Sequence, residues 1–269
     1  DSFNGPTFPV LHSLIVDEGS TCPTLEDCLR TISTWSKANP GHVPLILFIE
    51  PKALPVNTNP DFQAANNTEV ARRGLANWDA VGFERLDALV RDVFGRTLIT
   101  PDEVRGKRPT LRDAILKDGW PTLAATRGGV IVVLSASGAE RDVYLAGAPS
   151  LEGRAMFVPS SAPEPSAAII KRDVPLPNAF PRIVGRNFLV KTRADADAVE
   201  ARAGDLTRAT SALASGANVV ATDYPVSDPT IGPYVVDLPG TATARCNPVT
   251  APTWCRDRDV ENARGLRHP

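Results

Sequence analysis

Glu50 is the residue whose position most strongly indicates chemistry. It directly follows the apolar run 45–49 and precedes Pro51, and proline keeps the residue before it extended. We therefore expect Glu50 at the carboxyl end of a strand, which in barrel enzymes is the face that carries the active site. Its carboxylate could bind a metal ion or simply be solvated. Lys52 could neutralise an anionic ligand or be solvated in the same way.

His12 is the histidine best placed for acid/base catalysis. The chain has 3 histidines, and only His12 follows an apolar run, residues 10–11. His42 lies in an Asn-Pro-Gly turn, and His268 lies in an expected tail. A lone histidine is more often structural than catalytic, so the spacing leaves both interpretations of His12 open.

Two later apolar runs are also followed by charged or phenolic residues. Run 188–190 is followed by Lys-Thr-Arg-Ala-Asp, which includes Arg193 and Asp195. Run 219–221 is followed by Thr-Asp-Tyr-Pro, which includes Tyr224. Barrel enzymes often bind phosphate groups at such strand ends, so Arg193 and Tyr224 are candidate substrate contacts. Asp195 instead suits the N-cap of the helix expected after it.

Motifs and charge exclude several classes of protein. The chain has no Gly-x-Ser-x-Gly turn, His-Glu-x-x-His helix, Walker A loop or Gly-x-Gly-x-x-Gly turn. Its net charge of -2 is spread along the chain without a basic stripe, which disfavours nucleic acid as a partner. No apolar run approaches the roughly 20 residues of a membrane-spanning helix, so we expect a soluble protein with no transmembrane segment.

The four cysteines form two close pairs in sequence, Cys22 with Cys28 and Cys246 with Cys255. Neither pair has the Cys-x-x-Cys spacing of a zinc or redox site, so we favour two local disulfides among the possible pairings. Disulfides indicate an oxidising compartment and hence a secreted or otherwise extracytoplasmic protein. The chain opens in polar, turn-rich sequence without an initiator methionine, and we expect the natural N-terminus to lie upstream.

The spacing of apolar residues predicts four helices that would position these side chains. Thr24 is expected to cap the first, which ends near residue 39, and the second covers about 83–93. Thr110 is expected to cap a short third helix, and the fourth runs from about 194 to 214.

Six short apolar runs without alternation are interpreted as strands buried on both faces, as in a parallel sheet. Strands that alternate with helices favour an α/β protein built from βα units. An open sheet accepts six strands, whereas a closed barrel of this class needs more, so periodicity leaves both open. Long loops are expected at 51–77 and 159–181. The six runs are residues 10–11, 45–49, 130–134, 155–158, 188–190 and 219–221.

Longer motifs resemble the calcium-dependent phosphatidylinositol-specific phospholipase C family of microbial secreted enzymes. Residues 10–52 contain Val-Leu-His, Ser-Thr-Cys-Pro-Thr, Cys-Leu-Arg, Trp-Ser-Lys-Ala-Asn-Pro-Gly-His and Ile-Glu in that order. Further pieces agree along nearly all of the chain. They are Leu-Ile-Thr-Pro-Asp at 98–102, Gly-Trp-Pro-Thr-Leu at 119–123, Thr-Arg-Ala-Asp at 192–195, Ser-Gly-Ala at 215–217, Thr-Asp-Tyr-Pro at 222–225 and Cys-Asn-Pro at 246–248.

This resemblance implies a TIM-type α/β barrel of the phospholipase C kind. The six predicted strands would be the third to eighth of the family, so the first two βα units would be absent from this chain. In the family those units carry another catalytic histidine and most calcium ligands. We expect a single barrel domain over residues 1–269, in which 240–269 form a disulfide-closed C-terminal extension.

The resemblance also implies a calcium-dependent phosphoric diester hydrolase that cleaves phosphatidylinositol to an inositol cyclic phosphate and diacylglycerol. His12 would protonate the leaving group and Glu50 would bind Ca²⁺. Lys52, Arg193 and Tyr224 would contact the phosphate and the inositol. The partner would be a phosphoinositide lipid at a membrane surface, bound peripherally by a monomer.

Gly129 departs from the expected pattern, because the resemblance places a lysine at this position. Two alternatives to the hydrolase also stay open. One is a catalytically inactive module that binds lipid headgroups, and the other is a glycerophosphodiester phosphodiesterase.

Overall fold

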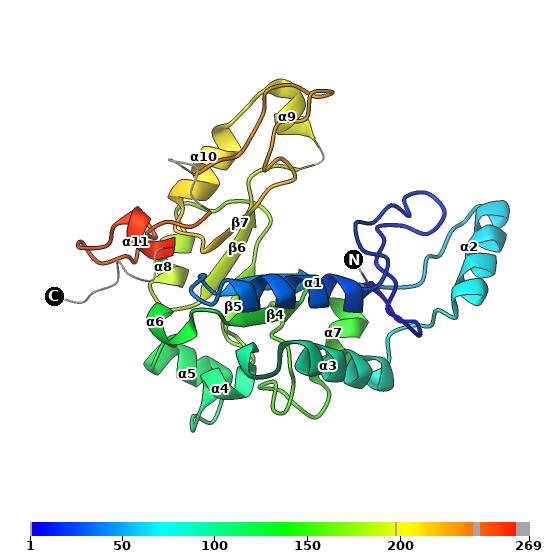
Figure 1. Cartoon of the computed structure of the whole chain (residues 1–269), viewed down its shortest axis with the longest axis horizontal. Coiled ribbons are helices and arrows are strands. Elements are labelled where there is room, and N and C mark those ends of the chain that lie inside the picture. The colour runs from blue at the N-terminus through cyan, green and yellow to red at the C-terminus, as the bar shows by residue number, and fades with distance from the viewer. Residues whose placement is uncertain (1, 197, 239–242, 262–269) are drawn as a thin grey trace. The chain divides into compact units, whose positions relative to one another are not determined.

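The computed structural model describes residues 2–196, 198–238 and 243–261 (Figure 1). Contacts between residues divide the chain into two compact units. Unit 1 comprises residues 1–40, 44–103 and 128–158, and unit 2 comprises residues 41–43, 104–127 and 159–269. The prediction of a single domain with a C-terminal extension stays a prediction.

Unit 1 is built on a buried pair of parallel strands. β2 (Leu45–Ile49) pairs with β4 (Val130–Leu134) from Leu45 opposite Val130 to Ile49 opposite Leu134. All of β4 is buried, as expected for an apolar strand covered on both faces. β3 (Pro51–Lys52) pairs in parallel with β1 (Ser2–Phe3). Because β3 follows β2 after one residue, the chain changes its strand partner at Glu50.

Four helices belong to unit 1, and two short helical elements follow α3 (Ala80–Phe94). Thr24 caps α1 (Leu25–Ala38) as predicted, since its side chain accepts a hydrogen bond from the Asp27 amide. In α3, Phe83 stacks on Trp78 at 4.8 Å between ring centroids, and its edge meets Tyr144 at 5.3 Å. The helices are α1 (Leu25–Ala38), α2 (Pro60–Arg73), α3 (Ala80–Phe94) and α7 (Gly138–Leu145), with the 3₁₀ turn η1 (Gly95–Thr97) and α4 (Pro101–Arg105) between them.

Unit 2 contains a three-stranded parallel sheet in the order β5-β6-β7. β5 (Ile169–Lys171), β6 (Leu189–Arg193) and β7 (Val219–Ala221) are short. Phe180, Val184 and Val190 form an apolar cluster on this sheet. The helices are α5 (Leu111–Lys117), α6 (Leu123–Thr126), α8 (Phe180–Val184), α9 (Val199–Ala203), α10 (Thr207–Ala214) and α11 (Asp257–Glu261).

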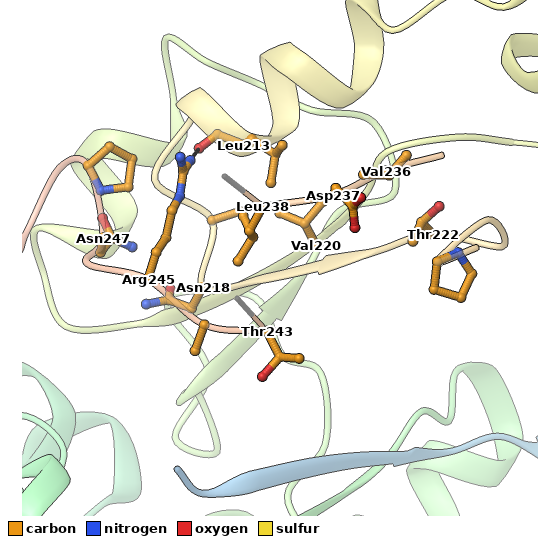
Figure 2. A pocket seen from close by; sticks show the side chains of 14 residues that line it. Leu213, Asn218, Val220, Thr222, Val236, Asp237, Leu238, Thr243, Arg245 and Asn247 are labelled. Atoms are coloured by element: carbon orange, nitrogen blue, oxygen red, sulfur yellow. Dashed lines mark hydrogen bonds between the residues drawn. The ribbon is translucent and has the colours of Figure 1, made fainter. Parts of the chain in front are cut away.

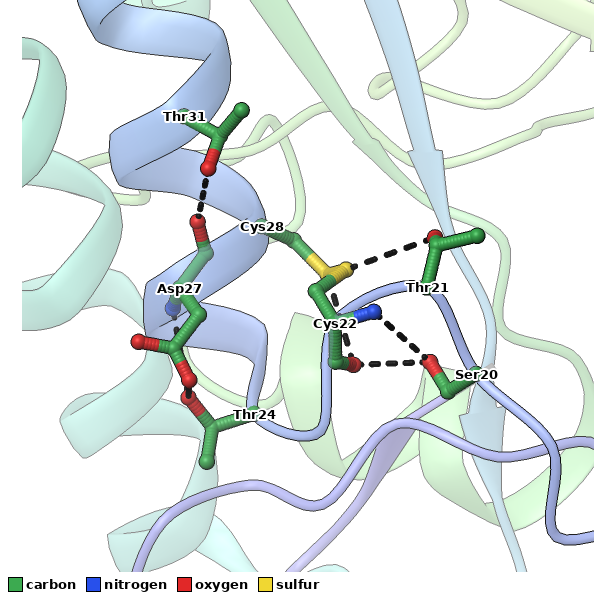
Figure 3. Close-up of a disulfide and its surroundings, with 7 residues drawn as sticks. All are labelled: Ser20, Thr21, Cys22, Thr24, Asp27, Cys28 and Thr31. Atoms are coloured by element: carbon green, nitrogen blue, oxygen red, sulfur yellow. Dashed lines mark hydrogen bonds between the residues drawn. A yellow bond between two sulfur atoms is a disulfide. The ribbon is translucent and has the colours of Figure 1, made fainter.

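Both predicted disulfides are present. Cys22–Cys28 ties the segment before α1 to the first turn of that helix (Figure 3), and Cys246–Cys255 closes a loop of the C-terminal segment. Every described cysteine is therefore used in a disulfide. None of the helices in the described part of the chain is both long and apolar enough to cross a membrane.

Two of the predicted helical and loop assignments were wrong. The expected loop 51–77 contains α2, which has capping residues at both ends but no apolar stripe, since Asn66 is its only buried residue. Periodicity could not reveal such a helix. The expected helix over 194–214 is divided into α9 and α10, because Gly204 ends α9 in the left-handed conformation at φ 64°.

Two predicted strands also differ, and one strand was not predicted. Val10 makes only an isolated antiparallel bridge with Ser2, because the chain reverses between them. Phe157 makes only an isolated bridge with β4, and β5 lies in the expected loop 159–181. The α/β class is confirmed, but the described residues form two two-stranded sheets and one three-stranded sheet and no closed barrel.

A buried polar cluster crosses the core of unit 1. The Tyr144 hydroxyl donates to Asp87 Oδ1 at 2.7 Å and accepts from the Met156 amide at 3.1 Å. The Ala155 amide donates to the same Asp87 oxygen at 3.2 Å. Burial raises the pKa of Asp87 despite these donors.

We expect Tyr144→Phe to lower the free energy of unfolding by about 1–3 kcal/mol, because it leaves buried polar partners without their hydrogen bonds. Urea denaturation followed by tryptophan fluorescence measures this loss. Tyr234→Phe is the matched control, since the buried Tyr234 hydroxyl has no hydrogen-bond partner in the described structure, and it should change the value by less than about 0.5 kcal/mol. Equal losses in the two variants would contradict this assignment.

Candidate functional site

Glu50 lies where the sequence predicted it, directly after β2. Its backbone oxygen accepts from the Ser2 amide at 2.8 Å, and the neighbouring Ile49 oxygen accepts from Ser135 at 2.7 Å. The backbone is thus held on both sides of the position at which β2 becomes β3. The Glu50 side chain is 46% exposed, and its Oε1 lies 3.0 Å from Lys52 Nζ. The structure therefore brings these two predicted residues together as an ion pair.

His12 lies in a turn and not at the end of a strand, which corrects the sequence-based expectation. Ser13 and Asp17 exchange backbone hydrogen bonds at 2.9 and 3.2 Å, so the turn returns Asp17 to the side of His12. His12 Nδ1 lies 3.0 Å from Asp17 Oδ2, with both side chains largely exposed. The sequence analysis did not identify Asp17. The signal that could have found it is an acidic residue five positions after a candidate histidine.

A carboxylate next to one imidazole nitrogen has a defined chemical effect. It favours the tautomer that carries the proton on Nδ1. Nε2 is then the nitrogen that can exchange a proton with a ligand. The His12–Asp17 pair is therefore equipped for general acid or base catalysis.

The His12 turn and the Glu50 strand share one apolar cluster. Leu11 and Leu14, on either side of His12, pack with Phe3 of β1, and Leu54 beyond β3 packs against the same cluster. In the described structure no hydrogen bond or ion pair joins His12 to Glu50 directly. The packing anchors both segments while leaving their polar side chains exposed.

Unit 2 carries two cations on one face of β6. Lys191 and Arg193 are two residues apart, so their side chains point to the same side of the strand. Lys191 Nζ lies 2.8 Å from Asp173 Oδ1, and Arg193 Nη2 lies 2.7 Å from Asp223 Oδ2. Lys171 of β5 is the register partner of Lys191 and adds positive charge. The sequence did not single out Lys191, although a lysine inside a buried strand is an unusual and visible signal.

Asp195 does not cap a helix, contrary to the prediction. It is completely buried, and its carboxylate accepts hydrogen bonds from the Thr222 hydroxyl and the Asp223 amide. Helix α9 begins at Val199 after Ala198. A buried carboxylate needs strong donors, and the turn after β7 supplies them whereas the start of α9 lies too far along the chain.

Tyr224 is buried to 8% exposure and packs edge-on against Tyr234 at 5.4 Å between ring centroids. Ala201 belongs to the same apolar cluster. As a substrate contact Tyr224 stays a prediction, and its packed ring has less reach than the Arg193 guanidinium. His12, Glu50 and Lys52 belong to unit 1, whereas Arg193 and Tyr224 belong to unit 2. His268 falls outside the described residues.

Glu50 is the only predicted calcium ligand, and calcium takes about 6–8 oxygen ligands. The described residues contain no group of 3 or more His, Cys, Asp or Glu side chains able to hold a metal ion. The Lys52 ammonium also pairs with the Glu50 carboxylate and would compete with a metal ion for it. The described residues therefore do not by themselves form a calcium site.

Gly129 lies at the end of the β2–β4 pair opposite to Glu50. Its oxygen accepts from the Leu45 amide at 3.0 Å, at the amino end of both strands. Five residues of strand, about 16 Å, separate this point from the carboxyl end at which Glu50 is found. The missing lysine therefore does not remove a cation from the immediate surroundings of Glu50.

Unit 2 also has a cavity of about 450 Å³ beside β7 (Figure 2). Val220 and Thr222 of the β7 region line one side, and Asp237 and Arg245 from the C-terminal segment line another. Arg245 is held by a 2.6 Å hydrogen bond to the Leu213 oxygen. None of the predicted site residues lines this cavity.

The Lys191–Asp173 pair predicts a pH dependence of stability. Burial alone would raise the pKa of Asp173, but the hydrogen bond from Lys191 and the charges of Lys191, Lys171 and Arg193 outweigh it and lower the pKa. The folded state thus favours ionised Asp173. Its contribution is fully present above the ordinary aspartate pKa of about 3.9 and is lost as the pH falls through the lowered value.

We therefore expect the stability difference between the protein and Asp173→Asn to be constant at neutral pH and to shrink below about pH 4. Denaturant titrations at neutral and acidic pH measure the difference. Glu84→Gln, at an exposed position of α3, is the control and should leave the pH profile unchanged. A difference that grows on acidification would contradict the pairing.

The chain resembles known proteins in both sequence and structure. Residues 1–248 match the family model PI-PLC-C1, described as phosphoinositide phospholipase C, Ca2+-dependent. A Ca2+-dependent phosphatidylinositol-specific phospholipase C from Streptomyces antibioticus is similar in structure, with 20% identity over 76% of this chain and 71% of that chain and a TM-score of 0.50. No curated protein matches the chain.

A calcium-dependent phosphoinositol-specific phospholipase C from a Gram-negative Pseudomonas species is also similar, at 19% identity and a TM-score of 0.42. That match covers 78% of this chain and 62% of the other. The Streptomyces structure supports the mixed α/β fold, and the family model covers most of the sequence. The chain therefore belongs to the calcium-dependent phosphoinositide phospholipase C family.

Proposed function

We propose that this protein is a phosphoric diester hydrolase that cleaves phosphatidylinositol to an inositol cyclic phosphate and diacylglycerol. The His12–Asp17 pair is the observation that carries the proposal, because it is a solvent-accessible proton donor with an orienting carboxylate. Membership of a phospholipase C family supports the reaction class. The two disulfides are consistent with an extracytoplasmic location.

His12 acts as the general acid in the proposed reaction. The inositol 2-hydroxyl attacks phosphorus and forms the new P–O bond of the cyclic phosphate. The bond from phosphorus to the glycerol oxygen breaks, and that oxygen takes a proton from His12 Nε2. Asp17 accepts the hydrogen bond of Nδ1, which orients the ring and keeps Nε2 available. By the family resemblance, the proton of the attacking hydroxyl passes to the other catalytic histidine of the family.

The cations of the protein are proposed to hold the anionic headgroup. Arg193 offers a planar guanidinium that can form paired hydrogen bonds with phosphate oxygens, and Lys52 offers a point charge. Tyr224 is the third proposed contact, to the inositol. We add Lys191, which shares its face of β6 with Arg193. Asp173 and Asp223 keep the two β6 cations ordered when no ligand is bound.

The proposed partner is a phosphoinositide in a membrane, reached from the water side by a monomeric, peripherally bound protein. Exposure supports this view, because a proton donor for a lipid headgroup must remain open to the surface. The His12 side chain is 69% exposed, whereas a histidine with a purely structural role in the core would be buried.

One observation favours the alternative of a headgroup-binding module without catalysis. The Lys52 ammonium lies 3.0 Å from Glu50 Oε1 and neutralises that carboxylate. A protein that kept this ion pair on binding a lipid would hold the headgroup without assembling a metal site. Turnover of phosphatidylinositol decides between the two candidates, and comparison with glycerophosphoinositol tests the phosphodiesterase alternative.

We expect His12→Ala to reduce diacylglycerol release from phosphatidylinositol by about 10²- to 10⁴-fold, because the leaving oxygen loses its proton donor. Asp17→Asn should cause a smaller loss. The assay uses mixed micelles and the full-length protein. His42→Ala is the matched control and should retain activity, since its Nδ1 is 2.6 Å from the Val43 carbonyl. Full activity of His12→Ala would refute the proposed mechanism.

We propose Glu50 as one oxygen ligand of Ca²⁺, and its substitution should be visible without any activity measurement. Glu50→Gln is expected to weaken calcium binding by on the order of tenfold or more, because the site loses a negative charge. Lys52→Met should strengthen binding by removing the competing ammonium. Isothermal titration calorimetry on the full-length protein measures both, with Lys37→Met on the exposed side of α1 as control. An unchanged calcium affinity in Glu50→Gln would remove Glu50 from the metal site.

A further inference from the structure

Asp195 is a fully buried carboxylate of unit 2 that the proposed reaction does not use. It follows the end of β6 by two residues. Burying an ionised carboxylate is costly unless strong hydrogen-bond donors compensate for the lost water. The hydrogen-bond donors to Asp195 therefore indicate the role of this buried carboxylate.

Both of its partners belong to the turn after β7. Oδ2 accepts from the Thr222 hydroxyl, and Oδ1 accepts from the Asp223 amide at 3.0 Å. The Thr222 oxygen in turn accepts from the Tyr224 amide at 3.0 Å. The carboxylate therefore fixes the backbone of three successive residues at the end of the neighbouring strand.

The middle residue of that turn holds the principal cation of the proposed headgroup site. Asp223 pairs with Arg193 at 2.7 Å, although 62% of the Asp223 side chain is exposed. An exposed ion pair contributes little stability when its backbone is not held, because ordering two side chains offsets the attraction. A fixed Asp223 backbone removes part of that ordering cost.

The other side of Arg193 is also held through its backbone. The Arg193 oxygen accepts from Arg208 Nε at 3.3 Å, and the amide of the next residue, Ala194, donates to the Ala221 oxygen at 2.8 Å. With its backbone held, Arg193 can still change the direction of its side chain. The ion pair with Asp223 fixes the direction of the guanidinium.

We propose that Asp195 is a positioning residue that holds Asp223, and through it Arg193, in the direction required to bind the phosphate of an inositol headgroup. This inference rests on the proposed function and assigns a role within it. An oriented guanidinium binds phosphate more tightly because less side-chain entropy is lost on binding. Asp195 itself is buried and does not touch the ligand.

Asp195→Asn tests the proposal with little change in volume. Its amide oxygen can still accept from Asp223, but its NH₂ group cannot accept from the Thr222 hydroxyl. We expect the dissociation constant for myo-inositol 1-phosphate, measured by calorimetry on the full-length protein, to rise about 5- to 10-fold, as for loss of one charge-assisted hydrogen bond. Asp205→Asn, an exposed residue that accepts from the Thr207 amide, is the matched control and should bind normally.

A double-mutant cycle with Arg193→Gln separates positioning from simple stabilisation. If Asp195 acts through Arg193, then Asp195→Asn changes the dissociation constant less than about twofold once Arg193 is replaced. Its effect on the thermal unfolding temperature should persist in both backgrounds. Equal weakening of binding in both backgrounds, or no weakening in the unmodified protein, would overturn the proposal.

A readout without ligand keeps this test independent of the proposed function. The Arg193 Nε–H resonance in ¹⁵N NMR reports how firmly the guanidinium is held, and it should show faster rotation and proton exchange in Asp195→Asn. If the unmodified protein binds no inositol phosphate but this resonance responds, the proposed function is wrong and the positioning of Arg193 stands. If the resonance is the same in both proteins, the positioning role is wrong whatever the protein binds.

Discussion

Parallel strands that are buried on both faces present most of their polar side chains where they end. β4 is buried along its whole length, and β2 beside it reaches its first carboxylate at Glu50. The same constraint acts in unit 2, where Asp195 and Asp223 follow the ends of β6 and β7. The distribution of polar groups along the chain therefore depends on the lengths of these short buried strands.

Opposite charges in contact are the second recurring feature of the candidate site residues. Glu50 is paired with Lys52, Lys191 with Asp173 and Arg193 with Asp223. Such pairs keep each cation and carboxylate ordered, and each can be exchanged for a ligand of the matching charge. His12 and Asp17 extend the principle to a proposed proton donor, since the carboxylate lies 3.0 Å from Nδ1 and orients the imidazole.

Elements with strong local signals could be predicted, and elements without them could not. α1 and α5 follow threonine caps that were recognised, and β2 and β4 have the predicted limits because each is one uninterrupted apolar run. α2 was missed because its stability comes from capping and not from an apolar stripe. The predicted strand at 10–11 was wrong because a reversal of the chain, which periodicity cannot show, pairs Val10 with Ser2.

The sequence by itself determined the α/β class, both disulfides, the family and the place of Glu50 after its strand, since these depend on local pattern or short separation. Tertiary structure decided which charges meet. Asp17 reaches His12 only through a turn, and Asp195 finds its donors beyond β7, 27 residues away. Hydrogen-bond partners of a buried carboxylate are set by the packing of strands that are distant in sequence, and no local pattern encodes that distance.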